Sequence, residues 1–205
     1  MAVKYLHNLN NTLNPHSSIV CKSCGLYLNQ LPALDKLKKS HAFWVGLSAV
    51  QFDEDVEKLP LSPLTNSGKL IEKIEAPFDN DISFYKTNLV KCLPLRGDKI
   101  RYPVEHEMEK CFPNFQYELK KLKPSVVFLL GKQVGSFVMK KLSKNDISLN
   151  ENFQYDSFTL NNISFFPIHH PSYILVYKRK NLQQYIDSIR TILEETTVRE
   201  ENLAI

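Results

Sequence analysis

The feature that most constrains the fold is one short segment without a polar residue. Val126–Leu130 is entirely apolar and lies between Ser125 and Gly131. Strands of a parallel sheet have this composition when helices cover both faces of the sheet. The sequence therefore predicts a buried strand over 125–130, in a domain that mixes strands and helices.

Three more segments have the length and apolar content of strands. They are Ala42–Val45, which ends at Gly46, Ser83–Val90 and Ile163–Ile168. Helical patterns occur at Ser67–Glu75, Pro103–Leu122, Lys132–Leu142 and Lys180–Glu195, and loops are predicted over 53–63 and 91–102. Strands that alternate with such helices predict a three-layer α/β/α sandwich with a four-stranded, mainly parallel sheet.

The composition indicates one folded domain. The chain has 205 residues, of which 43% are hydrophobic and 23% are charged, the ordinary balance of a protein that buries a core. We expect a single domain over 1–205 with a polar N-terminal arm over about residues 1–40. The net charge of +4 is compatible with a polyanionic partner but does not establish one.

No apolar run approaches the roughly 20 residues of a membrane span. Met1–Asn8 lacks the apolar core and cleavage site of a signal peptide. We therefore expect a soluble, cytoplasmic, monomeric protein. In such a reducing compartment, four cysteines that include a Cys-x-x-Cys pair indicate metal ligands or redox groups rather than disulfides.

The cysteines are Cys21, Cys24, Cys92 and Cys111, and only the first two form a short-spaced pair. Four thiolates can bind a zinc ion or an iron–sulfur cluster. A cubane cluster is the larger group and accepts ligands from separate segments, so it suits the spacing somewhat better. Spacing alone does not distinguish iron from zinc, and the alternative is that Cys24 and Cys111 are simply buried apolar residues.

The predicted strands place four residues at one edge of the sheet. Ligands of open α/β sheets bind beyond the carboxyl ends of the strands, and Gly46, Asn88, Gly131 and His170 lie at those ends. The sequence therefore predicts a shared crevice there. Taken singly, Asn88 is more typical of a turn or a cap, and a histidine such as His170 or its neighbour His169 is often a core residue.

Five motifs follow one another along the chain. They are Cys21-Lys-Ser-Cys24, Thr87-Asn88-Leu-Val-Lys91-Cys92-Leu-Pro94, Pro103-Val-Glu105 through Cys111, Val126-Val-Phe-Leu-Leu-Gly131 and His170-Pro171-Ser172-Tyr173-Ile-Leu175. In this order they resemble the iron–sulfur (family four) uracil-DNA glycosylases over most of the chain. The resemblance implies the uracil-DNA glycosylase fold and a structural [4Fe-4S] cluster on the four cysteines. It also implies hydrolysis of the N-glycosidic bond of a damaged or foreign base in DNA.

The same resemblance implies roles for single residues. Asn88 would bind the base, with Gly46 and Leu47 of the first motif beside it, and His170 would be the catalytic histidine. An asparagine amide can accept a hydrogen bond from N3–H of uracil and donate one to O4. A histidine can stabilise the negative charge that develops on O2 as the bond breaks. The predicted contacts to the DNA groove and phosphates are Ser172, Tyr173, Leu175, Lys178 and Arg179.

The first motif departs from the family pattern. Where the family has Gly-Glu-Ala-Pro-Gly, this chain has Gly46-Leu-Ser-Ala-Val-Gln51, so the carboxylate and the proline are missing. Ser48 is then the residue predicted to position a water molecule. The acidic run Asp53–Asp55 is a possible substitute, although such loops are usually just solvated.

A second departure concerns the platform for the flipped base. The family has a phenylalanine in a Pro-Phe-x-Gly segment, whereas the run 60–68 contains no aromatic residue. Leu64 or Pro63 would be a weaker platform, unless Tyr85 or Phe52 compensates. These losses place ordinary uracil specificity in question.

The leading hypothesis is a DNA glycosylase that removes uracil or a modified pyrimidine from single- or double-stranded DNA. An alternative is an anti-phage glycosylase specific for a bulky modified pyrimidine. Two further alternatives are a non-catalytic module that binds DNA or protein on the same fold, and an interaction protein held together by zinc. An enzyme acting on chromosomal DNA is expected to associate with the nucleoid.

Overall fold

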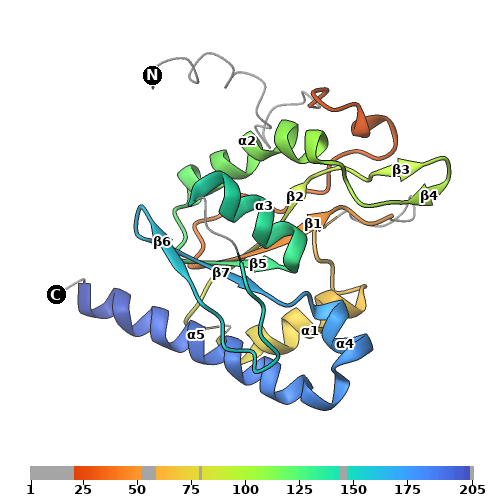
Figure 1. Cartoon of the computed structure of the whole chain (residues 1–205). Helices are drawn as coiled ribbons and strands as arrows, with labels where there is room; N and C mark the ends of the chain where they lie inside the picture. Colours follow the sequence, from red (N-terminus) through yellow and green to blue (C-terminus); the bar gives the residue numbers. More distant parts are fainter. Residues whose placement is uncertain (1–20, 52–58, 79, 144–146, 204–205) are drawn as a thin grey trace.

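The protein folds into one mainly parallel sheet between two layers of helices (Figure 1). The computed structural model describes residues 21–51, 59–78, 80–143 and 147–203. The strands of the sheet are β1 (Ala42–Ser48), β2 (Phe84–Val90), β5 (Val126–Leu130), β6 (Phe158–Leu160) and β7 (Ile163–Ile168). Their spatial order is β2-β1-β5-β7-β6, and β6 pairs antiparallel to β7. The predicted three-layer α/β/α class is confirmed, but the described sheet has five strands rather than four.

Each face of the sheet has its own helices (Figure 1). One face packs against α2 (Glu105–Leu122) and α3 (Lys132–Leu142). The other face packs against α1 (Asn66–Glu75), α4 (Pro171–Tyr177) and α5 (Leu182–Leu203). Short 3₁₀ turns lie at Leu26–Leu28, Ala76–Phe78 and Arg179–Asn181.

Strand alternation produces two separate hydrophobic cores. Phe43 and Val45 of β1 lie in the core beneath α2 and α3, whereas Ala42 and Trp44 lie in the core beneath α1 and α5. Successive side chains of a strand point to opposite faces, so a strand covered on both faces is apolar at every position. This explains the composition of Val126–Leu130, all of whose residues are buried.

The elements missed by sequence analysis are all short. Strand β6 forms a hairpin with β7 through Asn161 and Asn162, which have φ angles of 51° and 64°. Asparagine tolerates these positive angles better than most residues, as two-residue hairpin turns require. A second hairpin joins β3 (Leu95–Arg96) to β4 (Lys99–Ile100), where a loop was predicted.

The last helices also differ from prediction. Helix α4 occupies 171–177, a stretch to which sequence analysis assigned no element, and α5 runs over 182–203 rather than 180–195. Pro171 stands at the first turn of α4, where proline is favoured because its fixed φ suits the helix and no N–H is needed. This signal was present in the sequence but was used only as part of a motif.

The described part of the predicted N-terminal arm packs onto the domain beside the end of β2. The N–H of Ala33 donates to the carbonyl of Lys91 at 2.8 Å, and the side chain of Asn29 donates to the carbonyl of Leu93 at 2.8 Å. Residues 1–20 of the arm lie outside the described residues. None of the helices in the described ranges is both long and apolar enough to cross a lipid bilayer.

Candidate active site

The four strand-end residues lie along one edge of the sheet. Gly46 is directly opposite Asn88 in the register of β1 and β2. Gly131 follows β5 and donates its N–H to the carbonyl of Ile168 at 2.7 Å, and a Cβ on Gly131 would lie 3.3 Å from the Cβ of His170. Strands β1 and β5 separate β2 from β7, which at strand spacing is about 14 Å between backbones. Asn88 and His170 therefore come from strands that are not neighbours in the sheet.

Gly46 provides the space that the Asn88 side chain occupies. A Cβ built on Gly46 would overlap with Oδ1 of Asn88 and would lie 3.1 Å from Cδ2 of Leu61. Asn88 is buried, so its amide is held against this bare stretch of backbone. The glycine is therefore required by close approach, and the amide is fixed in position at the strand end.

Leu61, rather than Leu64, is the residue that lies against Gly46. The side chain of Leu64 is 67% exposed, whereas Leu61 is half-buried, with Cδ2 only 3.1 Å from the position of a Cβ on Gly46. Sequence analysis missed Leu61, although this residue belongs to the run 60–68 that was compared with the Pro-Phe-x-Gly segment. Tyr85 does not compensate for the lost ring, because it is buried on the opposite face of the sheet and bonds to Glu118.

Strand alternation separates the other predicted residues of the first motif. Leu47 packs against the core beneath α2 and α3, so its side chain points away from the face that carries Asn88. Ser48 is on the same face as Gly46, because these two residues are two positions apart in β1. The acidic run Asp53–Asp55 and Phe52 lie outside the described residues. Among the described residues that we place at this edge, none is acidic.

His170 is held by the start of α4. It is the N-cap residue of that helix, and its Nδ1 accepts a hydrogen bond from the N–H of Ser172 at 3.1 Å. Because Nδ1 accepts this bond, the neutral ring carries its proton on Nε2. Burial lowers the pKa of His170 to about 4. At neutral pH the residue is therefore an uncharged ring that can donate a hydrogen bond through Nε2–H.

The neighbouring histidine has a structural role. His169 is buried, its Nδ1 lies 3.0 Å from the hydroxyl of Tyr155, and its ring stacks on Tyr173 at 5.4 Å between centroids. Its main-chain carbonyl accepts a hydrogen bond from the hydroxyl of Tyr185 at 2.9 Å. Burial also lowers the pKa of His169. Of the two histidines, His170 is the one that caps α4 and lies beside Gly131.

The predicted DNA contacts fall into different environments. Ser172 is exposed, and its hydroxyl lies 2.8 Å from Nδ1 of His170, so it orients the histidine. Tyr173 and Leu175 are half-buried against the core beneath α1 and α5. The ammonium of Lys178 lies 2.8 Å from a carboxylate oxygen of Glu151.

Arg179 of the predicted set is exposed. The large apolar side chains that α4 exposes are those of Val176 and Tyr177, at 67% and 73%. Sequence analysis did not select these two residues, because the helix period that buries Ile174 and exposes its successors was not recognised. They place an apolar surface next to Arg179 and the end of α4.

The four cysteines share one neighbourhood. Burial, followed by the nearby Cys111, Cys24 and Cys21, raises the pKa of the Cys92 thiol to about 12, so all four groups are close enough to interact electrostatically. The sulfur of Cys111 accepts hydrogen bonds from the main-chain N–H of Lys91 at 3.4 Å and from the amide of Asn114 at 3.6 Å. Such bonds to sulfur are among the features that tune iron–sulfur sites.

Within the described residues, the cysteine side chains are not arranged as a preformed site for a metal ion. Among the described residues, no three cysteine, histidine or acidic side chains are grouped closely enough to bind one metal ion. A zinc site would place all of its sulfurs about 2.3 Å from one point. A cubane cluster bonds each thiolate to a separate iron and tolerates a wider spread.

Comparison with known proteins places this chain in a family. Residues 24–194 match the family described as the Uracil DNA glycosylase superfamily. The chain is 27% identical over 184 residues to the Type-4 uracil-DNA glycosylase of Saccharolobus solfataricus, covering 85% of this chain and 77% of that protein. It is 27% identical over 196 residues to the Type-4 uracil-DNA glycosylase of Sulfurisphaera tokodaii, covering 91% of this chain and 81% of that protein.

The family match spans β1 through most of α5 and includes Gly46, Asn88 and His170. The matched region therefore contains both the sheet and the residues that the strands bring to its edge. By its sequence and by its α/β/α architecture, the chain belongs to the uracil DNA glycosylase superfamily.

Proposed function

We propose that this DNA N-glycosylase hydrolyses the N-glycosidic bond of uracil in DNA and leaves an abasic site. Membership of the superfamily and the names of the two relatives support this activity. The observation that carries the proposal is the Asn88 amide held over Gly46, with the Nε2–H of His170 at the same edge of the sheet. These two groups match the two ends of a uracil ring.

Base recognition follows from the amide. The oxygen of Asn88 accepts a hydrogen bond from N3–H of uracil, and the nitrogen donates one to O4. Cytosine has an acceptor at N3 and a donor at N4, so a fixed amide meets it with the wrong pattern. A good pair of such bonds discriminates between bases by about 1–3 kcal/mol, and the burial of Asn88 keeps the amide from rotating to suit cytosine.

Bond cleavage relies on stabilising the leaving base. The bonding electron pair departs with the base, which accumulates negative charge on O2, and the sugar develops oxocarbenium character. The Nε2–H of His170 donates to O2, and a donor of this kind is worth about 2.7–4 kcal/mol in the transition state. Water then adds to C1′, and the proton that it loses to solvent balances the negative charge of the departing uracil anion. Ser48 is the residue that we propose positions this water.

A flipped nucleotide requires a pocket and a filler for the gap in the DNA. Extruding a base costs a few kcal/mol, which contacts in the pocket must offset. Leu61 supplies an apolar contact where the family has an aromatic ring. The exposed Val176 and Tyr177 at the end of α4 supply an apolar wedge for the DNA, and Arg179 supplies a cation for its phosphates.

We infer that Cys21, Cys24, Cys92 and Cys111 bind a [4Fe-4S] cluster. The cluster would supply a structural cross-link and no step of the hydrolysis. Its ligands come from the N-terminal arm, from the residue two positions after β2 and from α2. Thiolates from three separate segments, with N–H donors already directed at one sulfur, support this assignment.

The proposal is tested by release of free base. Protein purified without oxygen is incubated with DNA that contains uracil, and separately with DNA that carries phage-type modified cytosines. Mass spectrometry then identifies any base that is released. Release of uracil is the expected result. Release of a modified pyrimidine alone would contradict the uracil assignment, and DNA binding without any release would favour a non-catalytic binding module.

A further inference from the structure

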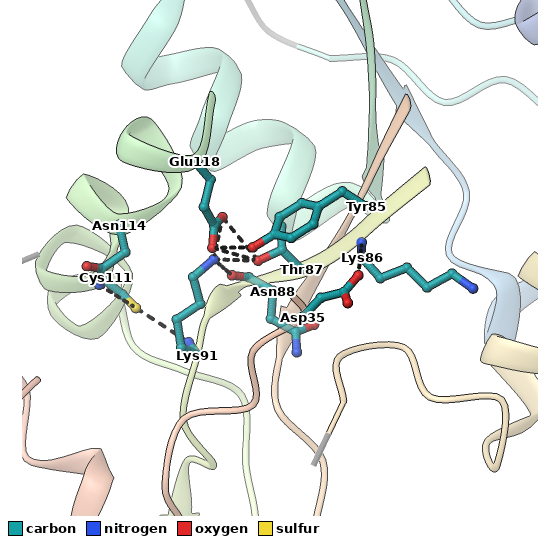
Figure 2. Close-up of polar contacts among 9 residues, drawn as sticks. All are labelled: Asp35, Tyr85, Lys86, Thr87, Asn88, Lys91, Cys111, Asn114 and Glu118. Carbon is teal, nitrogen blue, oxygen red and sulfur yellow. Dashed lines mark hydrogen bonds and ion pairs between the residues drawn. The ribbon is translucent and has the colours of Figure 1, made fainter. Parts of the chain in front are cut away.

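We propose that the buried pair Lys91–Glu118 positions Asn88, and that both are positioning residues for base recognition. This inference rests on the proposed role of Asn88 in binding uracil. The pair lies between α2 and β2 (Figure 2), on the side of the strand to which Thr87 points. It therefore touches neither the substrate nor the reacting atoms.

Every donor of the Lys91 ammonium has a partner. Nζ donates to Oε2 of Glu118 at 2.7 Å, to Oγ1 of Thr87 at 2.5 Å and to the main-chain carbonyl of Asn88 at 2.7 Å (Figure 2). The side chains of Lys91 and Glu118 are 1% and 6% exposed. An ammonium has three hydrogens, so its geometry here is fully determined.

The Glu118 carboxylate is equally well satisfied. It accepts hydrogen bonds from the hydroxyl of Tyr85 at 3.2 Å and from the hydroxyl of Thr87 at 3.2 and 3.1 Å, in addition to the bond from Lys91. A buried ion pair is often no more stabilising than apolar residues of similar size, because both charges lose their water. Stability alone therefore does not explain this network, whereas a need for fixed geometry does.

The contact with Asn88 shows that the Lys91–Glu118 pair holds the main chain of this residue. Strand β2 is an edge of the sheet, so a carbonyl that is directed away from β1 has no neighbouring strand to bond to. The Lys91 ammonium supplies the missing donor to the Asn88 carbonyl. The side chains of Thr87 and Asn88 point to opposite faces, so the network fixes the backbone from behind while the amide faces the base.

Lys91 is itself anchored at its main chain. Its N–H donates to the sulfur of Cys111 at 3.4 Å, and its carbonyl accepts from the N–H of Ala33 at 2.8 Å. The residue thus connects the base-binding asparagine with the cysteine neighbourhood and the N-terminal arm. A shift of the cysteine region would be transmitted to Asn88 through this one side chain.

The test replaces the pair without leaving a lone buried charge. In Lys91→Met/Glu118→Gln the ammonium is lost, while the amide oxygen still accepts from Tyr85 and Thr87. The matched control is Lys86→Met/Glu75→Gln, which removes an ion pair of 2.8 Å, 18% and 8% exposed, between the same strand and α1. A second comparison, Thr87→Val against Thr87→Ser, removes or keeps the shared hydroxyl without changing any charge.

The main measurement is the preference of the protein for binding uracil over another base, rather than the rate of uracil release. Binding is compared between a single-stranded oligonucleotide with one 2′-fluoro-2′-deoxyuridine, whose glycosidic bond resists hydrolysis, and the same strand with 2′-fluoro-2′-deoxycytidine, which presents the opposite pattern at N3 and at position 4. Loss of folded protein weakens binding to both oligonucleotides equally, whereas a displaced Asn88 lowers the ratio of the affinity for the uracil strand to the affinity for the other strand. We expect a fall of about tenfold in Lys91→Met/Glu118→Gln and in Thr87→Val. The Lys86 control and Thr87→Ser should keep the wild-type ratio.

Uracil release and the visible spectrum are recorded on the same samples. A wild-type ratio in both the folded double variant and Thr87→Val would overturn the positioning role. If the double variant does not fold, the Thr87 pair decides alone. If the wild-type protein itself neither prefers nor releases uracil, the proposed function fails, and this inference fails with it. Failure of the inference alone leaves wild-type release intact.

Discussion

At the scale of single residues, the site depends as much on a missing side chain as on those present. The bare backbone of Gly46 lets the Asn88 amide lie against β1, and Leu61 closes the same space from the loop before α1. His170 depends on its neighbour in a similar way, because the N–H of Ser172 selects its tautomer. These contacts fix the two groups that would bind uracil before any substrate arrives.

The close approach at Gly46 predicts the effect of one methyl group. In Gly46→Ala the Cβ would overlap with Oδ1 of Asn88, so the amide must move. We expect uracil release to slow by about 100-fold, as a displacement of roughly 1 Å can cause. The measurement is kcat/KM on uracil-containing DNA, with thermal unfolding as the control. An alanine variant with wild-type kcat/KM would show that the amide is not positioned by this contact.

His170 predicts a pH dependence of stability. Its pKa is about 4 in the folded protein against 6.5 as the ordinary value. Between these values the unfolded chain takes up a proton that the folded protein does not, so the free energy of unfolding falls as pH is lowered through this window. The loss is complete near pH 4 and absent above about pH 6.5, and it amounts to at most about 3 kcal/mol.

The matched variant is His170→Asn, since asparagine keeps the helix cap but does not titrate. Urea unfolding of both proteins from pH 7 to pH 4.5 isolates the contribution, because His169 is present in each. We expect the wild type to lose stability relative to the variant as pH falls. Parallel pH profiles would mean that His170 has an ordinary pKa.

At the scale of elements, the long strands and helices were predictable and the short ones were not. β1, β2, β5, β7 and the helices α1, α2 and α3 were predicted to within a few residues, because the apolar runs of the strands and the helical periodicity of the helices each extend over several residues. The two-residue strands β3 and β4 have too few residues for any period to show. Their pairing is decided by the turn between them, where Gly97 has a φ of 57°.

The loop that carries Leu61 is fixed to the first turn of α1. Oγ1 of Thr65 accepts from the N–H of Gly68 at 3.0 Å and donates to the carbonyl of Ser62 at 2.8 Å. A Cβ on Gly68 would overlap with that same carbonyl oxygen. The backbone of the loop therefore touches the helix where a side chain would normally stand.

This packing predicts that Gly68→Ala destabilises the protein, although alanine has a higher helix propensity than glycine. In an exposed helix the change stabilises by about 1 kcal/mol. Here we expect the free energy of unfolding to fall and uracil release to slow, since the loop with Leu61 must move. Urea unfolding and kcat/KM check both effects. Stabilisation by the alanine would show that the loop does not rest on the helix.

At the scale of the whole molecule, parallel topology explains why part of the site could be predicted. The carboxyl ends of β1, β2, β5 and β7 meet at one edge, so residues at those ends were predicted to converge whatever their side chains. Which side chain faces the edge was harder to foresee. Leu47 was predicted to lie beside the base, but strand alternation points its side chain to the opposite face of the sheet. Leu64 was predicted instead of Leu61 because the conformation of a loop leaves no periodic pattern in the sequence.

The cysteine neighbourhood predicts a visible signature for the molecule. Protein purified without oxygen should be brown, with broad absorbance near about 400 nm and about four irons per chain. Cys111→Ser should lose this colour and unfold at a lower temperature, because the arm, the end of β2 and α2 would no longer be joined. A colourless native protein that contains zinc would contradict the cluster assignment.

The most direct test of the whole account is single-turnover release of uracil by the wild type and by Asn88→Ala. Both proteins are measured at saturating enzyme on the same single-stranded substrate, with DNA affinity and visible spectrum as controls. We predict release by the wild type and a rate at least about 100-fold lower in the variant, with DNA affinity retained. Release at the same rate by both proteins, or no release by the wild type, would contradict the account.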